Sequence, residues 1–239
     1  MKEVHMSKKT ASDEVLPWMT VVGGAANLAM PDWREYAADV GRALGLEPSY
    51  LALSVTRVAW LPTVLRVSAG VPWPVLVLPL QRLSVPATPK SGPRLQRVLL
   101  ASDGSPEIVN AARSLAGGLR RQGIATTVLV VLNVGTTPPI WEGAGHHAAA
   151  WRSETTRRHG YPNHLEVVTG PPEERIPARI GDADLVVLAW HQVAAEDRAA
   201  VVRAVIDDGA GPPCLLVPFD WMKSNRRMWE PVGSATAVR

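Results

Sequence analysis

Apolar runs and amphipathic stripes alternate along the second half of the chain. Residues 97–102 form a short apolar run that stops at Asp103-Gly104-Ser105. From there apolar side chains recur at helical spacing, at Ile108, Ala111, Ala112, Leu115 and Leu119. This pattern predicts a strand, a turn and a helix that has Ser105 as its N-cap, Pro106 at its first position, and its end by Gly123.

The same alternation continues to residue 218. Residues 126–134 (TTVLVVLNV) and 183–190 (ADLVVLAW) are apolar without polar alternation, which is typical of strands covered on both faces. Residues 165–169 and 214–218 predict two shorter strands, and residues 146–159 and 196–207 predict helices. The sequence therefore predicts an α/β fold with a five-stranded parallel sheet and helices on both faces.

The connection after residue 169 holds two prolines, Pro172 and Pro177. A proline inside a helix removes a backbone donor and clashes with the preceding turn. Pro177 is therefore expected to shorten or kink the third helix of this unit.

The first 80 residues resemble part of the later series. Residues 19–23, 49–55 and 71–80 (MTVVG, SYLALSV and VPWPVLVLPL) parallel residues 165–170, 183–189 and 212–219. Between the first two segments lies a helical stripe of Trp33, Tyr36, Ala37, Val40 and Leu44. These parallels indicate an internal repeat of a strand-helix-strand-helix-strand half only.

Composition shifts divide the chain into five parts. We expect a flexible N-terminus over residues 1–16, the half unit over 17–80, and a Pro-rich linker over 81–95. The fuller domain spans residues 96–220, and residues 221–239 form a flexible tail with basic and aromatic side chains.

Charge and cysteine content narrow the class of protein. The chain has 239 residues, 46% of them hydrophobic and 20% charged, which is typical of a folded soluble protein. A net charge of +3 is too small for a dedicated nucleic-acid binder. The single cysteine, Cys214, excludes an intrachain disulfide and a Cys-rich metal site. Residues 58–80 contain Arg66 and four prolines, which argues against a membrane span, and residues 1–14 lack the apolar core of a secretory signal. We expect a cytoplasmic protein.

The second unit resembles the universal stress protein family. The resemblance is carried by VLLASDGS (98–105), VLNV (131–134), VVTGPPEE (167–174), ADLVVLAW (183–190) and PPCLLVP (212–218), in the family's order. It implies an adenine-nucleotide α-hydrolase-like fold over about half of the chain. It also implies that Asp103 and Val134 occupy the positions that contact adenine and ribose in the ATP-binding members, with Gly104, Ser105 and Gly170 beside them.

The phosphate-binding loop of that family is missing. The family places a glycine-rich loop of the pattern Gly-x2-Gly-x9-Gly-Ser/Thr after the fourth strand, where backbone N–H groups approach the phosphates. Residues 190–198 (WHQVAAEDR) contain no glycine and no hydroxyl, and they include two carboxylates. The site at Asp103, Gly104, Ser105, Val134 and Gly170 is therefore expected to be vestigial, with no ATP bound.

Other chemistry has little support in the sequence. Asp-Gly-Ser before a helix is also ordinary turn and capping chemistry. A phosphatase of the haloacid dehalogenase type would need an aspartate where Ala101 stands. The histidines show no metal-ligand spacing, Ser105 has no Gly-x-Ser-x-Gly context, and Cys214 lies inside an apolar strand. We expect no catalytic residue and no metal, and packing roles for the dispersed tryptophans.

Two functions follow as hypotheses. The first is a non-catalytic universal-stress-protein-like module, regulatory or stress-related, that works through protein contacts as a homodimer or with another protein. Family members commonly dimerise through the last strand, so residues 71–80 and 212–219 would pair with each other or between two chains. The alternative is a sensor that binds AMP, cyclic AMP or ATP beside Asp103, Val134 and Gly170, with Arg175 or Arg179 as the anion partner.

Overall fold

The computed structural model describes residues 18–53, 57–79, 95–132, 146–190, 196–206 and 211–224. Two residues considered above, Val134 and His191, lie outside these ranges. So do the predicted N-terminal segment, nearly all of the predicted linker, and residues 225–239.

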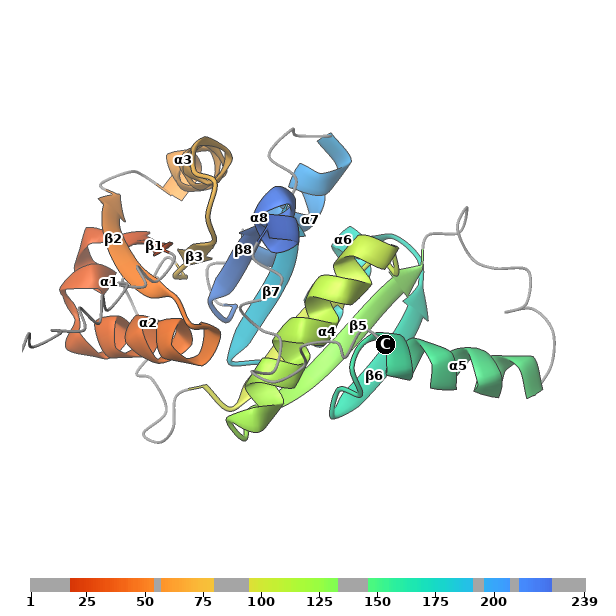
Figure 1. Cartoon of the computed structure of the whole chain (residues 1–239). Coiled ribbons are helices and arrows are strands. Elements are labelled where there is room, and N and C mark those ends of the chain that lie inside the picture. Colours follow the sequence, from red (N-terminus) through yellow and green to blue (C-terminus); the bar gives the residue numbers. More distant parts are fainter. Residues whose placement is uncertain are drawn as a thin grey trace, which may run out of the picture.

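Eight strands form one sheet in the order β2-β1-β3-β8-β7-β4-β5-β6 (Figure 1). Their bounds are Trp18–Gly24 (β1), Glu47–Leu53 (β2), Val75–Val77 (β3), Arg97–Ser102 (β4), Ala125–Leu132 (β5), His164–Thr169 (β6), Leu185–Trp190 (β7) and Cys214–Pro218 (β8).

The last five strands confirm the predicted parallel sheet. β4 pairs in parallel with β5 and β7, β5 pairs with β6, and β7 pairs with β8. The apolar runs of β4, β5, β7 and β8 are mostly buried, with Leu129, Leu185 and Val186 at 0% exposure, while the edge strand β6 is only partly buried. In such a sheet, ligands bind outside the carboxyl ends of the strands, which is the end that Ser102 and Asp103 occupy.

The first three strands are parallel to one another and join the sheet through an antiparallel seam between β3 and β8. At the seam Val75, Leu76 and Val77 lie opposite Leu216, Leu215 and Cys214. Of the two pairings that the sequence left open, this structure contains the one within the chain. Because β3 also pairs with β1, and β8 with β7, neither strand has a free edge.

The pairing order relates the two halves differently from the sequence parallels. β1 lies between β2 and β3, just as β4 lies between β5 and β7. The sequence parallels instead align β1 with β6, which lies at the far edge of the sheet. Strand pairing thus relates the first half to β4, β5 and β7.

Helices cover both faces, as predicted. On one face α1 (Ala25–Ala29), α2 (Pro31–Leu44), α4 (Pro106–Arg121) and α8 (Phe219–Ser224) contribute to one apolar cluster. On the other face lies a second cluster with α3 (Arg57–Gly70) and α7 (Glu196–Ile206). The remaining long helix, α5 (His146–Arg158), contacts α4 and extends outward beside β6 (Figure 1).

Several local features differ from the predicted boundaries. The strand expected over residues 71–80 is only Val75–Val77. α3 precedes it in the place of the second helix of the predicted half, for which the sequence pattern gave no residue range. Pro177 does shorten the third helix of the second unit: α6 spans only Pro172–Arg175, and a 3-10 turn, Pro177–Arg179, follows. α8 extends the domain at least to Ser224, and its Trp221 is buried. Among the described residues, no helix is long and apolar enough to cross a membrane.

Polar contacts also tie the two halves together. The Tyr36 hydroxyl donates to the carbonyl oxygen of Asp184 at 2.7 Å. The Asp184 carboxylate in turn accepts the backbone N–H groups of Gln96 and Arg97 at 3.0 and 2.8 Å. Burial of Tyr36, together with the nearby Asp184 carboxylate, raises the pKa of its hydroxyl. Since both apolar clusters also contain residues of both halves, the described strands form a single packed unit.

Candidate functional site

The Asp-Gly-Ser turn lies at the carboxyl end of the central strand β4. Asp103 is exposed, and its Oδ1 accepts the backbone N–H of Ser105 at 2.8 Å. Gly104 has a φ of +77°, a conformation that side chains with a Cβ rarely adopt. The turn therefore has the hydrogen bonding of an Asx turn, and the Ser105 amide is already occupied within the chain.

Ser102, the last residue of β4, is hydrogen-bonded to the turn. Its Oγ accepts the Gly104 N–H at 3.1 Å and lies 3.3 Å from Nε2 of His159. The other ring nitrogen of His159, Nδ1, lies 2.8 Å from the Thr155 carbonyl oxygen. A carbonyl can only accept, so Nδ1 carries the proton and Nε2 accepts the Ser102 hydroxyl.

Burial sets the charge state of His159. The His159 side chain is 1% exposed and the Ser102 side chain 4% exposed. Burial lowers the pKa of His159 and outweighs the opposing hydrogen bond to the Thr155 carbonyl; Arg158 also favours the neutral ring. A serine hydroxyl bonded to a neutral imidazole resembles a nucleophile with its base, but both groups lie beneath the turn rather than at the surface.

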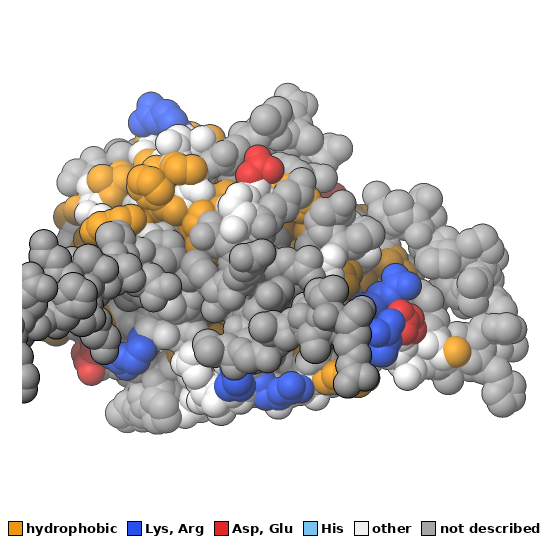
Figure 2. All heavy atoms as spheres, in the orientation of Figure 1, with side chains coloured by type: hydrophobic (Ala, Val, Ile, Leu, Met, Phe, Trp, Pro, Cys, Tyr) orange, Lys and Arg blue, Asp and Glu red, His pale blue; other side chains and the backbone are white. Residues whose placement is uncertain are grey.

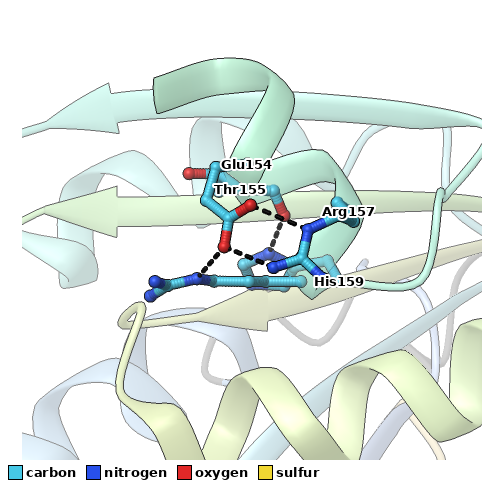
Figure 3. A network of polar contacts seen from close by, with 5 residues as sticks. Glu154, Thr155, Arg157 and His159 are labelled. Carbon is cyan, nitrogen blue, oxygen red and sulfur yellow. Dashed lines mark hydrogen bonds and ion pairs between the residues drawn. The ribbon is translucent and has the colours of Figure 1, made fainter. Parts of the chain in front are cut away.

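The last turn of α5, directly before His159, is stabilised by an exposed ion-pair cluster (Figure 3). Glu154 accepts hydrogen bonds from Arg157 at 2.8 and 2.6 Å and from Arg158 at 2.8 Å. These bonds lower the pKa of Glu154 to about 2. One turn of helix thus presents the Thr155 carbonyl to His159, while two arginines hold the neighbouring carboxylate.

Gly170 lies at the carboxyl end of β6, buried under the side chain of Arg175. Its φ is +126°, and a Cβ built there would lie 2.8 Å from Arg175 Nε. That same Nε donates to the Thr169 carbonyl oxygen at 3.0 Å. Arg179, the second predicted anion partner, instead forms an ion pair with Glu166 at 2.7 Å. The Nε groups of both arginines are therefore engaged within the chain.

The structure brings together only part of the predicted nucleotide site. Asp103, Gly104 and Ser105 form one turn, and Gly170 follows the edge strand β6, with β5 between β4 and β6. Val134 and residues 191–195 lie outside the described residues. Two cavities in the described part of the chain lie away from this turn: one between α5 and β6, the other near β3, α7 and β8.

The pair of Ser102 and His159 was not predicted. The two residues are 57 positions apart, and the sequence drew attention to the histidines only as possible metal ligands. A polar residue that ends an otherwise apolar strand, directly before the turn, is the one sequence feature that could have drawn attention to Ser102.

The described residues contain neither a candidate metal site nor a reactive thiol. No group of three His, Cys, Asp or Glu side chains there could hold a metal ion. Cys214 is buried in β8, and burial raises its pKa, so its thiol stays protonated at neutral pH.

Solved structures with a similar fold include universal stress proteins. One, from Archaeoglobus fulgidus DSM 4304, has a TM-score of 0.44 and 14% identity, with 84% of this chain and 86% of that chain covered. A universal stress protein in complex with cAMP has a TM-score of 0.37 and 18% identity, covering 52% of this chain and 98% of that chain.

A functionally unknown protein from Pseudomonas aeruginosa PAO1 has a TM-score of 0.45 and 15% identity, with 90% of this chain and 97% of that chain covered. No protein-family model and no curated protein matches the sequence. The resemblance predicted from the residues is thus found among solved structures.

Proposed function

We propose that this chain is a non-catalytic, universal-stress-protein-like module, regulatory or stress-related, that acts through protein contacts and does not bind ATP. The observation that carries the proposal is the closed Asp-Gly-Ser turn. Asp103 and the Ser105 amide bond to each other, so the carboxylate has a structural partner without a ligand.

The residues after β7 support the absence of ATP. A phosphate cradle needs several backbone N–H groups that converge on an anion, and glycine permits that approach. The chain has no glycine between Trp190 and Gly209, and α7 begins with Glu196 and Asp197. Carboxylates at that position would repel a triphosphate.

A non-catalytic role agrees with the burial of Ser102 and His159. A nucleophile and its base must reach a substrate atom, and these two side chains are almost fully enclosed. Their hydrogen bonds join β4, the turn and α5, which is a positioning role. The buried Cys214 thiol fits the reducing cytoplasm in which we place the protein.

The experiment is a nucleotide titration of the full chain by calorimetry and thermal unfolding, with MgATP, AMP, cyclic AMP and adenosine. We expect no heat of binding and no shift in Tm with MgATP. A ligand present at 100 times its Kd would stabilise the protein by about 2.7 kcal/mol, so specific binding would be visible. Saturable MgATP binding that Asp103→Ala abolishes would overturn the proposal.

The second candidate is a sensor of AMP or cyclic AMP, and one observation favours it. Asp103 is exposed, and a Cβ placed on Gly104 would meet nothing closer than Val130 Cγ1 at 3.7 Å. The Asp103 carboxylate is therefore accessible from solvent, where it could accept a hydrogen bond from a ribose hydroxyl. This candidate predicts AMP or cyclic AMP binding that is lost in Asp103→Ala and retained in Asp182→Ala, a control aspartate that is also exposed.

A further inference from the structure

Among the residues that the structure describes, no strand lies along the outer edge of β6. Within the sheet, β6 pairs only with β5, and the Gly170 N–H donates to the Leu132 carbonyl of that strand. In a parallel pair, alternate residues bond to the same neighbour, so His164, Glu166 and Val168 face β5.

The groups of Leu165, Val167 and Thr169 therefore face away from the sheet. The side-chain bond from Arg175 to the Thr169 carbonyl agrees with this alternation, because it comes from the outer side. The N–H and C=O groups of Leu165 and Val167 have no backbone partner among the described residues. An edge of this kind is a template for another strand.

A groove follows this edge. It is a cavity of about 480 Å³ between α5 and β6, lined by Arg152 and Thr156 from the helix and by His164, Leu165, Glu166 and Val167 from the strand. Leu165 and Val167 are only partly buried, and they pack against the apolar cluster on that face. The groove therefore combines backbone hydrogen-bonding groups with an apolar floor, as strand addition requires.

The charges beside the groove favour an acidic occupant. Figure 2 shows basic side chains on the right of the molecule, where α5 lies, next to an acidic one, and further basic side chains at the lower edge and on the left. Within α5, residues 152–158 hold three arginines against the single carboxylate of Glu154. The one carboxylate that lines the groove, Glu166, is already paired with Arg179. The excess positive charge complements a peptide with glutamate or aspartate side chains.

The opposite edge of the sheet is built differently. On β1, Thr20 and Val22 bond to the β3 side, so the neighbouring positions face β2. This alternation directs Pro48, Tyr50 and Ala52 of β2 outward. Pro48 has no N–H to offer, and Tyr50 is held by Arg34, whose guanidinium lies 5.5 Å from the ring centroid. Proline is a common protection of an edge strand, so β2 serves as the control.

We propose that the edge of β6 and the groove beside α5 bind an extended acidic segment of a partner protein by strand addition. The main chain of the segment bonds to Leu165 and Val167, and one of its carboxylates meets Arg152, the arginine of α5 that lines the groove. This inference rests on the proposed function in protein contacts and names the surface that makes them.

The test uses the full chain and two synthetic probes. The first probe is an eight-residue peptide of alternating valine and glutamate, with a fluorescent label and blocked ends; the second has lysine in place of glutamate. Fluorescence anisotropy is expected to show saturable binding of the glutamate peptide with a Kd below about 1 mM, and at least tenfold weaker binding of the lysine peptide.

Proline substitution locates the bound peptide. Val167→Pro removes an outward N–H that β5 does not use, and it is expected to weaken binding at least tenfold. Ala52→Pro makes the matched change at the edge of β2 and is expected to leave the affinity within twofold. Circular dichroism and thermal unfolding check that each variant is folded.

A charge-reversal variant tests the groove without introducing a proline into the strand. Arg152→Glu reverses one charge on the exposed part of α5, and it is expected to weaken binding of the glutamate peptide and strengthen that of the lysine peptide. The proposal is overturned if the glutamate peptide does not bind, if both peptides bind equally, if Ala52→Pro has the same effect as Val167→Pro, or if Arg152→Glu changes neither affinity.

Nucleotide titrations of the same samples separate the two proposals. Specific MgATP binding at Asp103 would refute the proposed function whatever the peptides do. Failure of the peptides without MgATP binding would refute only the docking surface on β6.

Discussion

The two halves of the sheet have the same local pairing but differ at the carboxyl end of their central strands. β1 ends in Gly23-Gly24, and a Cβ on Gly23 would lie 3.2 Å from side-chain carbons of both Leu28 and Leu78. At the end of β4, a Cβ on Gly104 would meet only ordinary contacts, at 3.7 and 3.8 Å.

The polar groups of the two strand ends differ in the same way. Asn27, which follows β1, is buried and donates to the Pro79 carbonyl oxygen at 2.5 Å. Asp103, which follows β4, is exposed, and among the described residues its carboxylate accepts the backbone N–H of Ser105 within the same turn. Apolar side chains thus fill the end of β1, while the end of β4 retains a carboxylate at the surface. Of the two strand ends, the end of β4 is therefore the better candidate for binding a small molecule.

The largest expected effect lies at the filled end of β1. Leu78 is 0% exposed and packs against Gly23. Leu78→Ala removes buried apolar groups and leaves a cavity, so we expect a loss of about 2–5 kcal/mol in the free energy of unfolding. Urea denaturation followed by tryptophan fluorescence and circular dichroism measures it, and the two signals should change together because the halves share both apolar clusters.

Leu51→Ala on the exposed edge strand β2 is the matched control, since Leu51 is 39% exposed. It is expected to cost less than about 1 kcal/mol. Equal losses for the two leucines would contradict the packed end of β1. Separate transitions for the two spectroscopic signals would contradict a single cooperative unit.

The regularity of the second half explains why its fold could be predicted. Long β-branched runs such as residues 125–132 define a buried strand by themselves, and Pro106 fixes the start of α4. The first half lacks such signals. β3 has only three residues because antiparallel pairing with β8, a long-range contact, determines its extent.

The half repeat placed a helix between residues 55 and 71 but did not define its bounds, and the contact between Ser102 and His159 was missed. Pro62 and the nearly continuous apolar sequence of α3 hide a helical period, although Trp60, Leu61 and Val64 face the core. The bond between Ser102 and His159 depends on the path of α5 over the sheet, which no local pattern encodes. The Asp-Gly-Ser turn, by contrast, is local chemistry, and the structure has it where the sequence predicted it.

His159, which lies beneath the turn after β4, should make the free energy of unfolding depend on pH. Because burial lowers the pKa of His159, the unfolded chain takes up a proton first as the pH falls below about 6.5. The unfolded state then binds more protons than the native state, so the free energy of unfolding decreases from pH 7 to pH 5. The slope from this group is at most about 1.4 kcal/mol per pH unit. Urea titrations at several pH values measure it.

His159→Gln, which lacks the titrating ring, should flatten this slope. Glu154 does not interfere in the same range: its pKa is lowered from 4.5 to about 2, so its stabilising pairs are lost only as the pH falls through that lower window. The first half has no counterpart of His159 among its described residues, so it should add no slope between pH 7 and pH 5. An unchanged slope in His159→Gln would contradict the buried, neutral histidine.

The smallest effect is expected at Asp103 itself. Asp103→Ala removes one exposed hydrogen bond to the Ser105 amide, and we expect a loss of about 0.5–1 kcal/mol in the free energy of unfolding. Asp103→Asn keeps an oxygen acceptor at the same position and should stay within about 0.5 kcal/mol of the wild type. Urea denaturation at pH 7 compares the three proteins. If Asp103→Ala lowered the free energy of unfolding as much as Leu78→Ala, the end of β4 would contribute as much to stability as the packed end of β1. Equal losses in the alanine and asparagine variants would show that the charge of Asp103, rather than its hydrogen bond, matters for stability.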